Sequence, residues 1–461
     1  MRPPKGVPVY RLIRSQEMVA YMWRYTLHTQ STQIPCAMLF AERLDFDALT
    51  RALNIEIARN DCMRLRLTRT PLGIREFFLP EYRLPSVEQR VFTTKEEQEA
   101  VLNADAAKAL DVFGGRTYRL MFFRAWDGRS GIYLKVSHMV MDAMATFLFF
   151  KDLLAVYDHL TKGTPLPRPL GSYEDIVRRE QNNPELDARI LEQKNKLRER
   201  VALDRRPFFC APNGPKMIDR QAKLLHKPDL DMPFAYSPFR DHTHFLKLRL
   251  SHEDSEAITA FVNENRLSAE WVVQLGFRLF LSKINREVND TMIWVLCPRR
   301  KTVAEKRCGG TLASPMPWRE ILHPEKTFRE TLATLAASQL ELFRLSDVPF
   351  TDVRDIEQKL YHLSIMQTPT SMMFSYLQLN EDAMDGRDFE YVGCDFAHYV
   401  MPLYTITMRD PRSGDYVFSY IHRLTHHTDE EIRRFHEGTV KAILAGVKNP
   451  DAPLADILKI L

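Results

Sequence analysis

The stretch 131–157 (GIYLKVSHMVMDAMATFLFFKDLLAVY) constrains the fold more than any other part of this chain. Apolar residues alternate over 132–136, which is typical of a β-strand with one buried face. Residues 143–157 form a mainly apolar run that is long enough for a helix. Strand and helix patterns alternate again after residue 245. The sequence therefore predicts the mixed α/β class, in an α+β two-layer arrangement.

The length of 461 residues favours two domains of ordinary size. A stretch rich in proline and glycine, 161–172, is typical of a loop and marks the best candidate for a boundary. We therefore predict an amino-terminal domain over 1–175 and a carboxyl-terminal domain over 176–461, the second including a charged linker helix.

Charge and composition exclude several classes of protein. The chain has 64 Lys+Arg against 60 Asp+Glu and no basic stripe interleaved with aromatic residues, so we expect no nucleic-acid partner. The most apolar stretches, 143–150 and 271–281, are too short or interrupted by polar residues, so we expect no membrane span. The amino terminus lacks the apolar core of a secretory signal, and the six cysteines show no metal-binding spacing. These features predict a cytoplasmic protein.

The strand predicted before residue 137 leads to His138, and Asp142 follows at the start of the predicted helix. The period of two places the His138 side chain on the inner face of the strand. An imidazole near a helix amino end is biased toward its neutral form, which can accept a proton from an attacking amine or hydroxyl. Taken alone, the same residues also fit a hydrogen-bonded core histidine and a helix-capping aspartate.

The segment 137–145 (SHMVMDAMA) resembles the HHxxxDG signature of the condensation-domain superfamily, the relatives of chloramphenicol acetyltransferase. His138 and Asp142 match the second histidine and the aspartate of that signature. Ser137 stands where the family has its first histidine, and Ala143 stands where it has glycine. The resemblance implies that His138 is the catalytic residue, that Ser137 supports it, and that Ala143 lies where the acceptor approaches the backbone.

Further segments resemble the boxes of this family in the same order along the chain. They are 10–17, 59–64, 298–300 with 309–310 and 317–319, 347–350, 371–380 and 451–457. The resemblance implies two chloramphenicol acetyltransferase-like lobes in a V-shaped pseudo-dimer with a central tunnel. It also implies an ion pair in which Arg300 supports Asp142. Ser375 could face the tunnel as an oxyanion or substrate hydrogen-bonder, or could simply bond a neighbouring strand.

The resemblance implies an acyltransferase that condenses a thioester-activated acyl group with an amine, with His138 as the general base or orienting residue. The donor would be phosphopantetheine on an acyl or peptidyl carrier protein, or CoA, and the enzyme would act as a free-standing monomer without a bound cofactor. Two alternatives stay open. One is an acyl-CoA-dependent O-acyltransferase that forms an ester with an alcohol acceptor, and the other is a non-catalytic relative that binds a carrier protein.

Two histidine groups suggest a metal site at first sight: His242 with His244, and His426 with His427. No third ligand follows either group at a fitting spacing. The sequence therefore predicts no metal site.

Overall fold

The computed structural model describes residues 1–25, 29–203, 207–234, 242–370, 372–378, 384–395, 399 and 401–461. The chain forms two compact units that are not contiguous in sequence. Unit 1 comprises Met1–Arg189, Pro298–Ser314 and Asn380–His398, and unit 2 comprises Ile190–Cys297, Pro315–Leu379 and Tyr399–Leu461. A boundary after residue 175 stays a prediction, and Arg300, which that boundary assigns to the second domain, lies in the same unit as His138.

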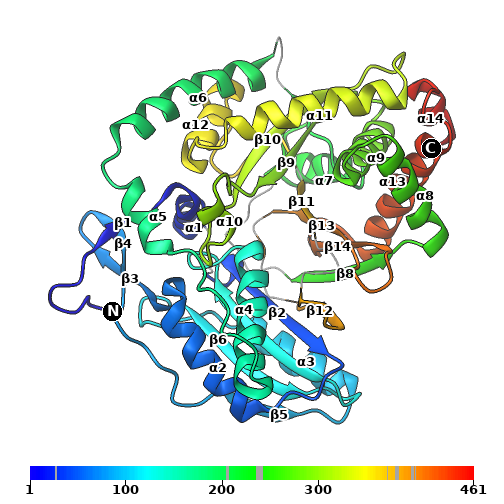
Figure 1. The fold of residues 1–461 in the computed structure, drawn as a ribbon. Helices are drawn as coiled ribbons and strands as arrows, with labels where there is room; N and C mark the ends of the chain where they lie inside the picture. Colours follow the sequence, from blue (N-terminus) through cyan, green and yellow to red (C-terminus); the bar gives the residue numbers. More distant parts are fainter. Residues whose placement is uncertain are drawn as a thin grey trace. The chain divides into compact units, whose positions relative to one another are not determined.

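Unit 1 contains a five-stranded sheet in the order β12-β2-β7-β6-β5, and a three-stranded antiparallel sheet in the order β1-β4-β3 (Figure 1). The strands of the larger sheet are β2 (Gln33–Phe40), β5 (Glu88–Val91), β6 (Tyr118–Arg124), β7 (Ser130–Ser137) and β12 (Phe389–Gly393). Those of the smaller sheet are β1 (Tyr10–Arg11), β3 (Leu65–Thr70) and β4 (Gly73–Phe78). The helices of this unit are α1 (Arg14–Tyr25), α2 (Phe46–Arg59), α3 (Lys95–Ala106), α4 (Ala143–Lys162), α5 (Tyr173–Glu180) and α10 (Val303–Lys306).

Helices α2 and α4 pack against each other and lie together on the five-stranded sheet (Figure 1). The ring of Phe46 in α2 lies 5.8 Å from that of Phe122 in β6. Asp45 caps α2, because its side chain accepts hydrogen bonds from the N–H groups of residues 47 and 48. The layers of unit 1 are therefore helix on sheet.

Unit 2 contains a six-stranded sheet in the order β10-β9-β11-β13-β14-β8. Its strands are β8 (Thr243–Arg249), β9 (Asp290–Cys297), β10 (Ser314–Ile321), β11 (Met372–Leu377), β13 (Leu403–Arg409) and β14 (Tyr416–Arg423). Its helices are α7 (Lys216–Leu224), α8 (His252–Glu264), α9 (Ala269–Ile284), α11 (Phe328–Arg344), α12 (Phe350–Tyr361), α13 (Asp429–Lys448) and α14 (Leu454–Ile460). Helix α6 (Pro184–Ala202) begins in unit 1 and ends in unit 2.

The core of unit 2 is centred on Phe277 of α9. Its ring stacks on Phe435 of α13 at 5.4 Å and meets Phe374 of β11 edge-on at 5.5 Å. Helices α9 and α13 thus cover the sheet and are held to it by aromatic contacts. The mixed α/β class predicted from the sequence is confirmed in both units. Within the described residues, none of the helices combines the length and the apolar character that a membrane span needs.

Candidate active site

Strand β7 delivers His138 to the end of the five-stranded sheet. It lies between β2 and β6, and all of its residues are buried, so it differs from the half-buried strand that the alternation predicts. The strand ends at Ser137, and His138 opens the turn that follows. The His138 N–H donates to the carbonyl of Thr32 at 2.8 Å, which extends the pairing with the β2 segment by one more bond. The backbone of His138 is therefore held by the sheet.

The imidazole of His138 is half-buried, and its Nδ1 lies 3.4 Å from Oγ1 of Thr311. Burial lowers the pKa of His138 below its usual value, although the charge of Asp142 opposes this effect. The side chain is therefore neutral at neutral pH, which is the state that a general base requires.

Ser137 is buried and stabilises the turn rather than extending toward His138. Its Oγ accepts the N–H of Met139 at 3.3 Å, and its carbonyl accepts the N–H of Val140 at 2.8 Å. These bonds fix the backbone on both sides of His138.

Asp142 is buried and accepts hydrogen bonds from three directions. It caps α4 by accepting the N–H of Ala145 at 2.8 Å. Its Oδ2 accepts the N–H groups of Leu312 and Ala313 at 2.8 and 3.0 Å. Burial raises the pKa of Asp142, but the guanidinium of Arg300 and the backbone donors outweigh it and hold the pKa below its usual range.

Arg300 connects Asp142 to the loop that follows α10. Its Nη2 donates to both carboxylate oxygens of Asp142, at 2.8 and 3.0 Å, and to the carbonyl of Gly310 at 2.9 Å. Its Nη1 donates to the carbonyls of Glu305 and Cys308, at 2.7 Å each. The arrangement makes Arg300 a brace between the turn after β7 and the loop around residue 310.

Ala143 is the first residue of α4 and is half-buried. The backbone at this position does not have a positive φ, so an L-residue fits there without strain. The family's glycine is therefore not needed here for backbone conformation, and the methyl group of Ala143 matters only for the space beside it.

A second layer of polar side chains supports the turn that follows β7. The spacing of residues in the sequence did not predict this layer. Nε2 of Gln16 donates to the carbonyl of Met139 at 3.0 Å and to the carboxyl group of Glu76 at 2.5 Å. Burial raises the pKa of Glu76 to about 8. The carbonyl of Thr311 accepts the Tyr173 hydroxyl at 3.1 Å. The one signal for this layer was that Gln16 lies in a segment resembling the family's opening box.

Ser375 lies on β11 in unit 2 and is buried. Its hydroxyl is 2.7 Å from that of Tyr404 on the neighbouring strand β13. This hydrogen bond agrees with a structural role in which Ser375 bonds a neighbouring strand. A role as an oxyanion donor stays a prediction. The box over 371–380 lies partly outside the described residues, which omit 371 and 379–380.

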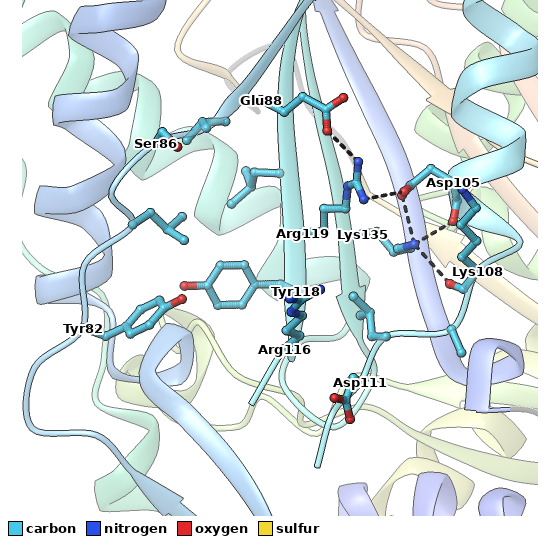
Figure 2. Close-up of a pocket in the computed structure, with 15 residues that line it drawn as sticks. Tyr82, Ser86, Glu88, Asp105, Lys108, Asp111, Arg116, Tyr118, Arg119 and Lys135 are labelled. Atoms are coloured by element: carbon cyan, nitrogen blue, oxygen red, sulfur yellow. Dashed lines mark hydrogen bonds and ion pairs between the residues drawn. The ribbon is translucent and has the colours of Figure 1, made fainter. Parts of the chain in front are cut away.

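A cavity of about 510 Å³ in unit 1 is separate from these residues, because none of the predicted site residues lines it (Figure 2). Arg119 lies between Glu88 and Asp105, with nitrogen-to-oxygen distances of 2.6 and 3.2 Å. Lys135 lies 2.9 Å from Asp105 on the same wall. These three contacts pair charges of opposite sign within the wall itself.

The histidine groups of the sequence are rearranged by the fold of unit 2. His244 is brought beside His422, which belongs to neither histidine group of the sequence, and Asp429 lies between them. The prediction of no metal site is not tested by this arrangement and stays a prediction. It considered only neighbours in sequence, and these three residues meet through strand pairing.

Comparisons with known proteins give a family match and a fold. Residues 8–194 match the family model described as the condensation domain. One of the plipastatin synthase proteins of Bacillus subtilis is 20% identical over 97% of this chain and 17% of its own length. The chain spans about a sixth or less of the length of the curated relatives it matches.

Two solved structures show the same fold. The first condensation domain of the calcium-dependent antibiotic synthetase, solved with a substrate analogue, has a TM-score of 0.80 at 16% identity, covering 97% of this chain and 98% of that one. The starter condensation domain of rhizomide synthetase, solved as a mutant with C8-CoA and Leu-SNAC, has a TM-score of 0.75 at 13% identity, covering 97% and 96%.

Proposed function

This chain is related to the condensation domains in sequence over residues 8–194 and in fold over nearly its whole length, and from this relationship we propose that it is an acyltransferase. It transfers an acyl group from a thioester to an amine and forms an amide. The observation that carries the proposal is the placement of His138: a neutral, half-buried imidazole on a turn that Asp142 and Arg300 hold rigidly.

In the proposed reaction the amine nitrogen attacks the thioester carbonyl carbon. A new C–N bond forms, the C–S bond breaks, and the sulfur leaves with the bonding electron pair. His138 takes a proton from the attacking amine and returns it to the leaving thiolate, so the imidazole ends the cycle neutral. Nδ1 faces Thr311, so Nε2 is the nitrogen left to meet the substrate.

The amino end of α4 supplies the second element of the proposal. The first N–H groups of a helix are not used within it, and they favour negative charge in front of them. Ala143 begins α4, and Asp142 orients this end by capping it. We assign the stabilisation of the tetrahedral oxyanion to this helix end.

The donor we propose is a phosphopantetheine thioester on a carrier protein, or an acyl-CoA. The rhizomide synthetase domain of similar fold was solved with C8-CoA, which supports a thioester of this kind. Breaking a thioester to form an amide is favourable by itself, so the reaction as proposed calls for no bound cofactor. A cytoplasmic, monomeric protein remains our expectation.

A second candidate function is carrier-protein binding without catalysis. Ser137 and Ala143 both depart from the family signature, and this observation keeps the candidate open. Ester formation with an alcohol acceptor makes the same demands on His138, so only the products formed from amines and from alcohols distinguish the two reactions.

The test offers the purified chain acyl-CoA and acyl-carrier thioesters, with amines and alcohols as acceptors, and follows product formation by intact mass. His138→Ala should lower turnover by about 10²–10⁴-fold. His323→Ala, which removes an exposed histidine of unit 2, should leave it unchanged. Unchanged turnover in His138→Ala would contradict the assignment. If the wild type binds carrier but never consumes a thioester, the non-catalytic function is correct. Products from alcohols alone would identify an O-acyltransferase.

A further inference from the structure

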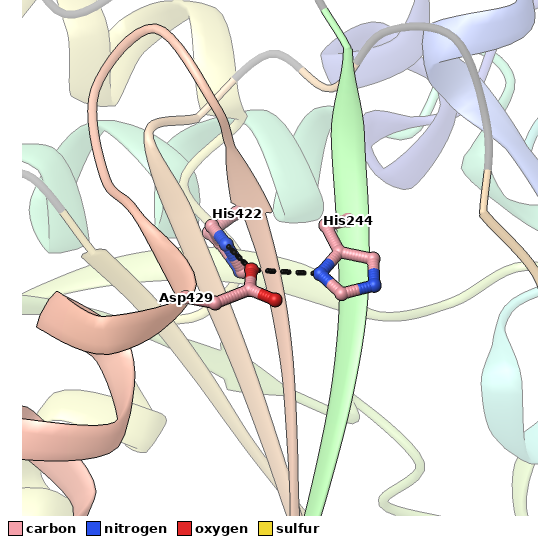
Figure 3. Close-up of side chains that lie close together, drawn as sticks. All are labelled: His244, His422 and Asp429. Atoms are coloured by element: carbon pink, nitrogen blue, oxygen red, sulfur yellow. Dashed lines mark hydrogen bonds and ion pairs between the residues drawn. The ribbon is translucent and has the colours of Figure 1, made fainter.

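Two imidazoles converge on one carboxylate oxygen in unit 2, and all three side chains carry atoms that can bind a metal ion (Figure 3). Nδ1 of His244 lies 2.7 Å from Oδ1 of Asp429, and Nε2 of His422 lies 3.0 Å from the same oxygen. The ligand atoms of the three residues all lie within 4.8 Å of one another. Figure 3 shows the carboxylate between the two imidazoles, which approach it from different strands.

The fold positions these residues through three separate elements. His244 and His422 are register partners on the antiparallel strands β8 and β14, so their side chains share one face of the sheet. Asp429 is the first residue of α13, which begins shortly after β14 ends. Thr428 caps this helix with its own side chain, so Asp429 is not needed as the cap. The carboxylate is therefore available to the two imidazoles.

We propose that His244, His422 and Asp429 bind one divalent transition-metal ion of the zinc class, with water completing its coordination. Two imidazole nitrogens and one carboxylate oxygen are ligands that such ions prefer, and the single negative charge of the set favours a dication. Three protein ligands leave a position open to solvent. His244 and Asp429 are about two-fifths exposed whereas His422 is fully buried, so the open position faces water.

Two of the three separations between ligand atoms need only small changes to hold such an ion, and the third, between the two imidazole nitrogens, is at most 4.8 Å. Bonds of about 2.0–2.1 Å in tetrahedral geometry set the ligand atoms roughly 3.4 Å apart. The present separations of 2.7 and 3.0 Å would open by about half an ångström. Each imidazole must present a lone pair, so the proton now shared with Asp429 moves to the other ring nitrogen or is released.

The proposed ion would connect the edge of a sheet to a helix. Strand β8 lies at the edge of the six-stranded sheet, and the ion would tie it to β14 and to the start of α13. The inference is independent of the acyl-transfer proposal, since His138 lies in unit 1 and the three ligands lie in unit 2. Failure of one proposal leaves the other intact.

The test measures zinc binding by the untagged full chain after treatment with a chelator, using isothermal titration calorimetry. The wild type should bind about one equivalent of Zn²⁺, and Co²⁺ should give the visible absorption of a low-coordinate site. His244→Ala and Asp429→Asn should each weaken Zn²⁺ binding on the order of tenfold or more. The matched control is His252→Ala, because His252 also contacts one carboxylate, that of Asp415 at 2.9 Å, but belongs to no group of three possible ligands among the residues that the structure describes.

A second readout separates loss of the ion from loss of the fold. Without metal, His244→Ala and the wild type should have the same circular dichroism, and Zn²⁺ should raise the Tm of the wild type and of His252→Ala only. The proposal is overturned if the wild type shows no saturable Zn²⁺ binding. It is equally overturned if His244→Ala binds as tightly as the wild type, or if His252→Ala weakens binding by the same factor.

Discussion

Asp142 and Arg300 lie far apart in sequence, yet one guanidinium nitrogen, Nη2, contacts both oxygens of the Asp142 carboxylate, at 2.8 and 3.0 Å. Both side chains are almost fully buried. The carboxylate also accepts three backbone N–H groups, so its bonding capacity is taken up by structure. This bonding supports the view that Asp142 holds the His138 turn in place and does not itself react.

Arg300→Ala should destabilise the protein by about 3–5 kcal/mol, because it leaves the Asp142 charge buried without its counter-ion. Urea unfolding followed by circular dichroism measures this change. Arg90→Ala removes an exposed ion pair with Glu88 and should change stability by only about 0–1 kcal/mol. Adding Asp142→Asn to Arg300→Ala should recover part of the loss, since it removes the unpaired charge. Equal stability of Arg300→Ala and wild type would contradict the bracing role.

The acid limb of the pH–rate profile should have its midpoint below pH 6.5, the ordinary value for histidine. Burial lowers the pKa of His138, and only the neutral imidazole can accept a proton, so activity falls as the pH drops through that lowered pKa. The measurement is kcat/KM across about pH 5–8. Preincubation at each pH, followed by assay at neutral pH, excludes irreversible unfolding. A midpoint above 6.5 would argue against His138 as the base.

The sequence predicted what is local and missed what depends on tertiary pairing. The strand, the turn with His138 and the cap at Asp142 follow from adjacent residues, and the structure has all three in that order. The contact of Gln16 with the carbonyl of Met139 joins segments that no periodicity connects. Burial of β7 on both faces depends on the packing of other elements, which the alternation over 132–136 does not reveal.

The two histidine groups illustrate the same limit. The spacing of His242 and His244 offered no third ligand, because the residues that complete the cluster are His422 and Asp429. Their approach depends on the register of β8 with β14, which pairs His244 with His422. A strand register of this kind could not be assigned from one sequence.

Glu76→Gln should make the protein less sensitive to alkaline pH. Burial raises the pKa of Glu76 to about 8. Between the ordinary pKa of a glutamate and pH 8, the folded protein therefore holds a proton on this carboxyl group that the unfolded protein has released. Stability contributed by this proton is lost as the pH rises, by at most about 1.4 kcal/mol per pH unit. Urea unfolding measures the free energy of unfolding of both proteins at a pH below this range and at a pH above it. The difference between Glu76→Gln and the wild type should shift in favour of the variant at the higher pH.

The control for this experiment is Glu96→Gln, which changes an exposed carboxylate of α3. It should follow the wild type at both pH values. If Glu76→Gln does the same, the carboxyl group of Glu76 is ionised in the folded protein, and the proposed linkage is wrong.

Ser375→Ala should lower stability more than activity. The change removes the hydrogen bond at 2.7 Å between this serine and the half-buried Tyr404, which costs about 0.5–1.5 kcal/mol. Turnover per folded molecule should stay nearly unchanged. Loss of an oxyanion donor would instead lower kcat by about 10²–10³-fold. Measuring kcat and the unfolding free energy on the same preparation separates the two roles, and a loss confined to kcat would support the role as an oxyanion donor.

Ala143→Gly should widen the range of acceptors without changing the fold. The backbone at residue 143 accepts either residue, so the change removes one methyl group at a cost of at most about 1 kcal/mol in stability. One methyl group of extra room should raise kcat/KM for bulky amines on the order of tenfold, with little effect on small ones. Ala145→Gly is the matched control, because it makes the same change in the first turn of α4 at a fully buried position. An equal effect of both variants on bulky acceptors would show that helix flexibility, and not space at residue 143, controls acceptor size.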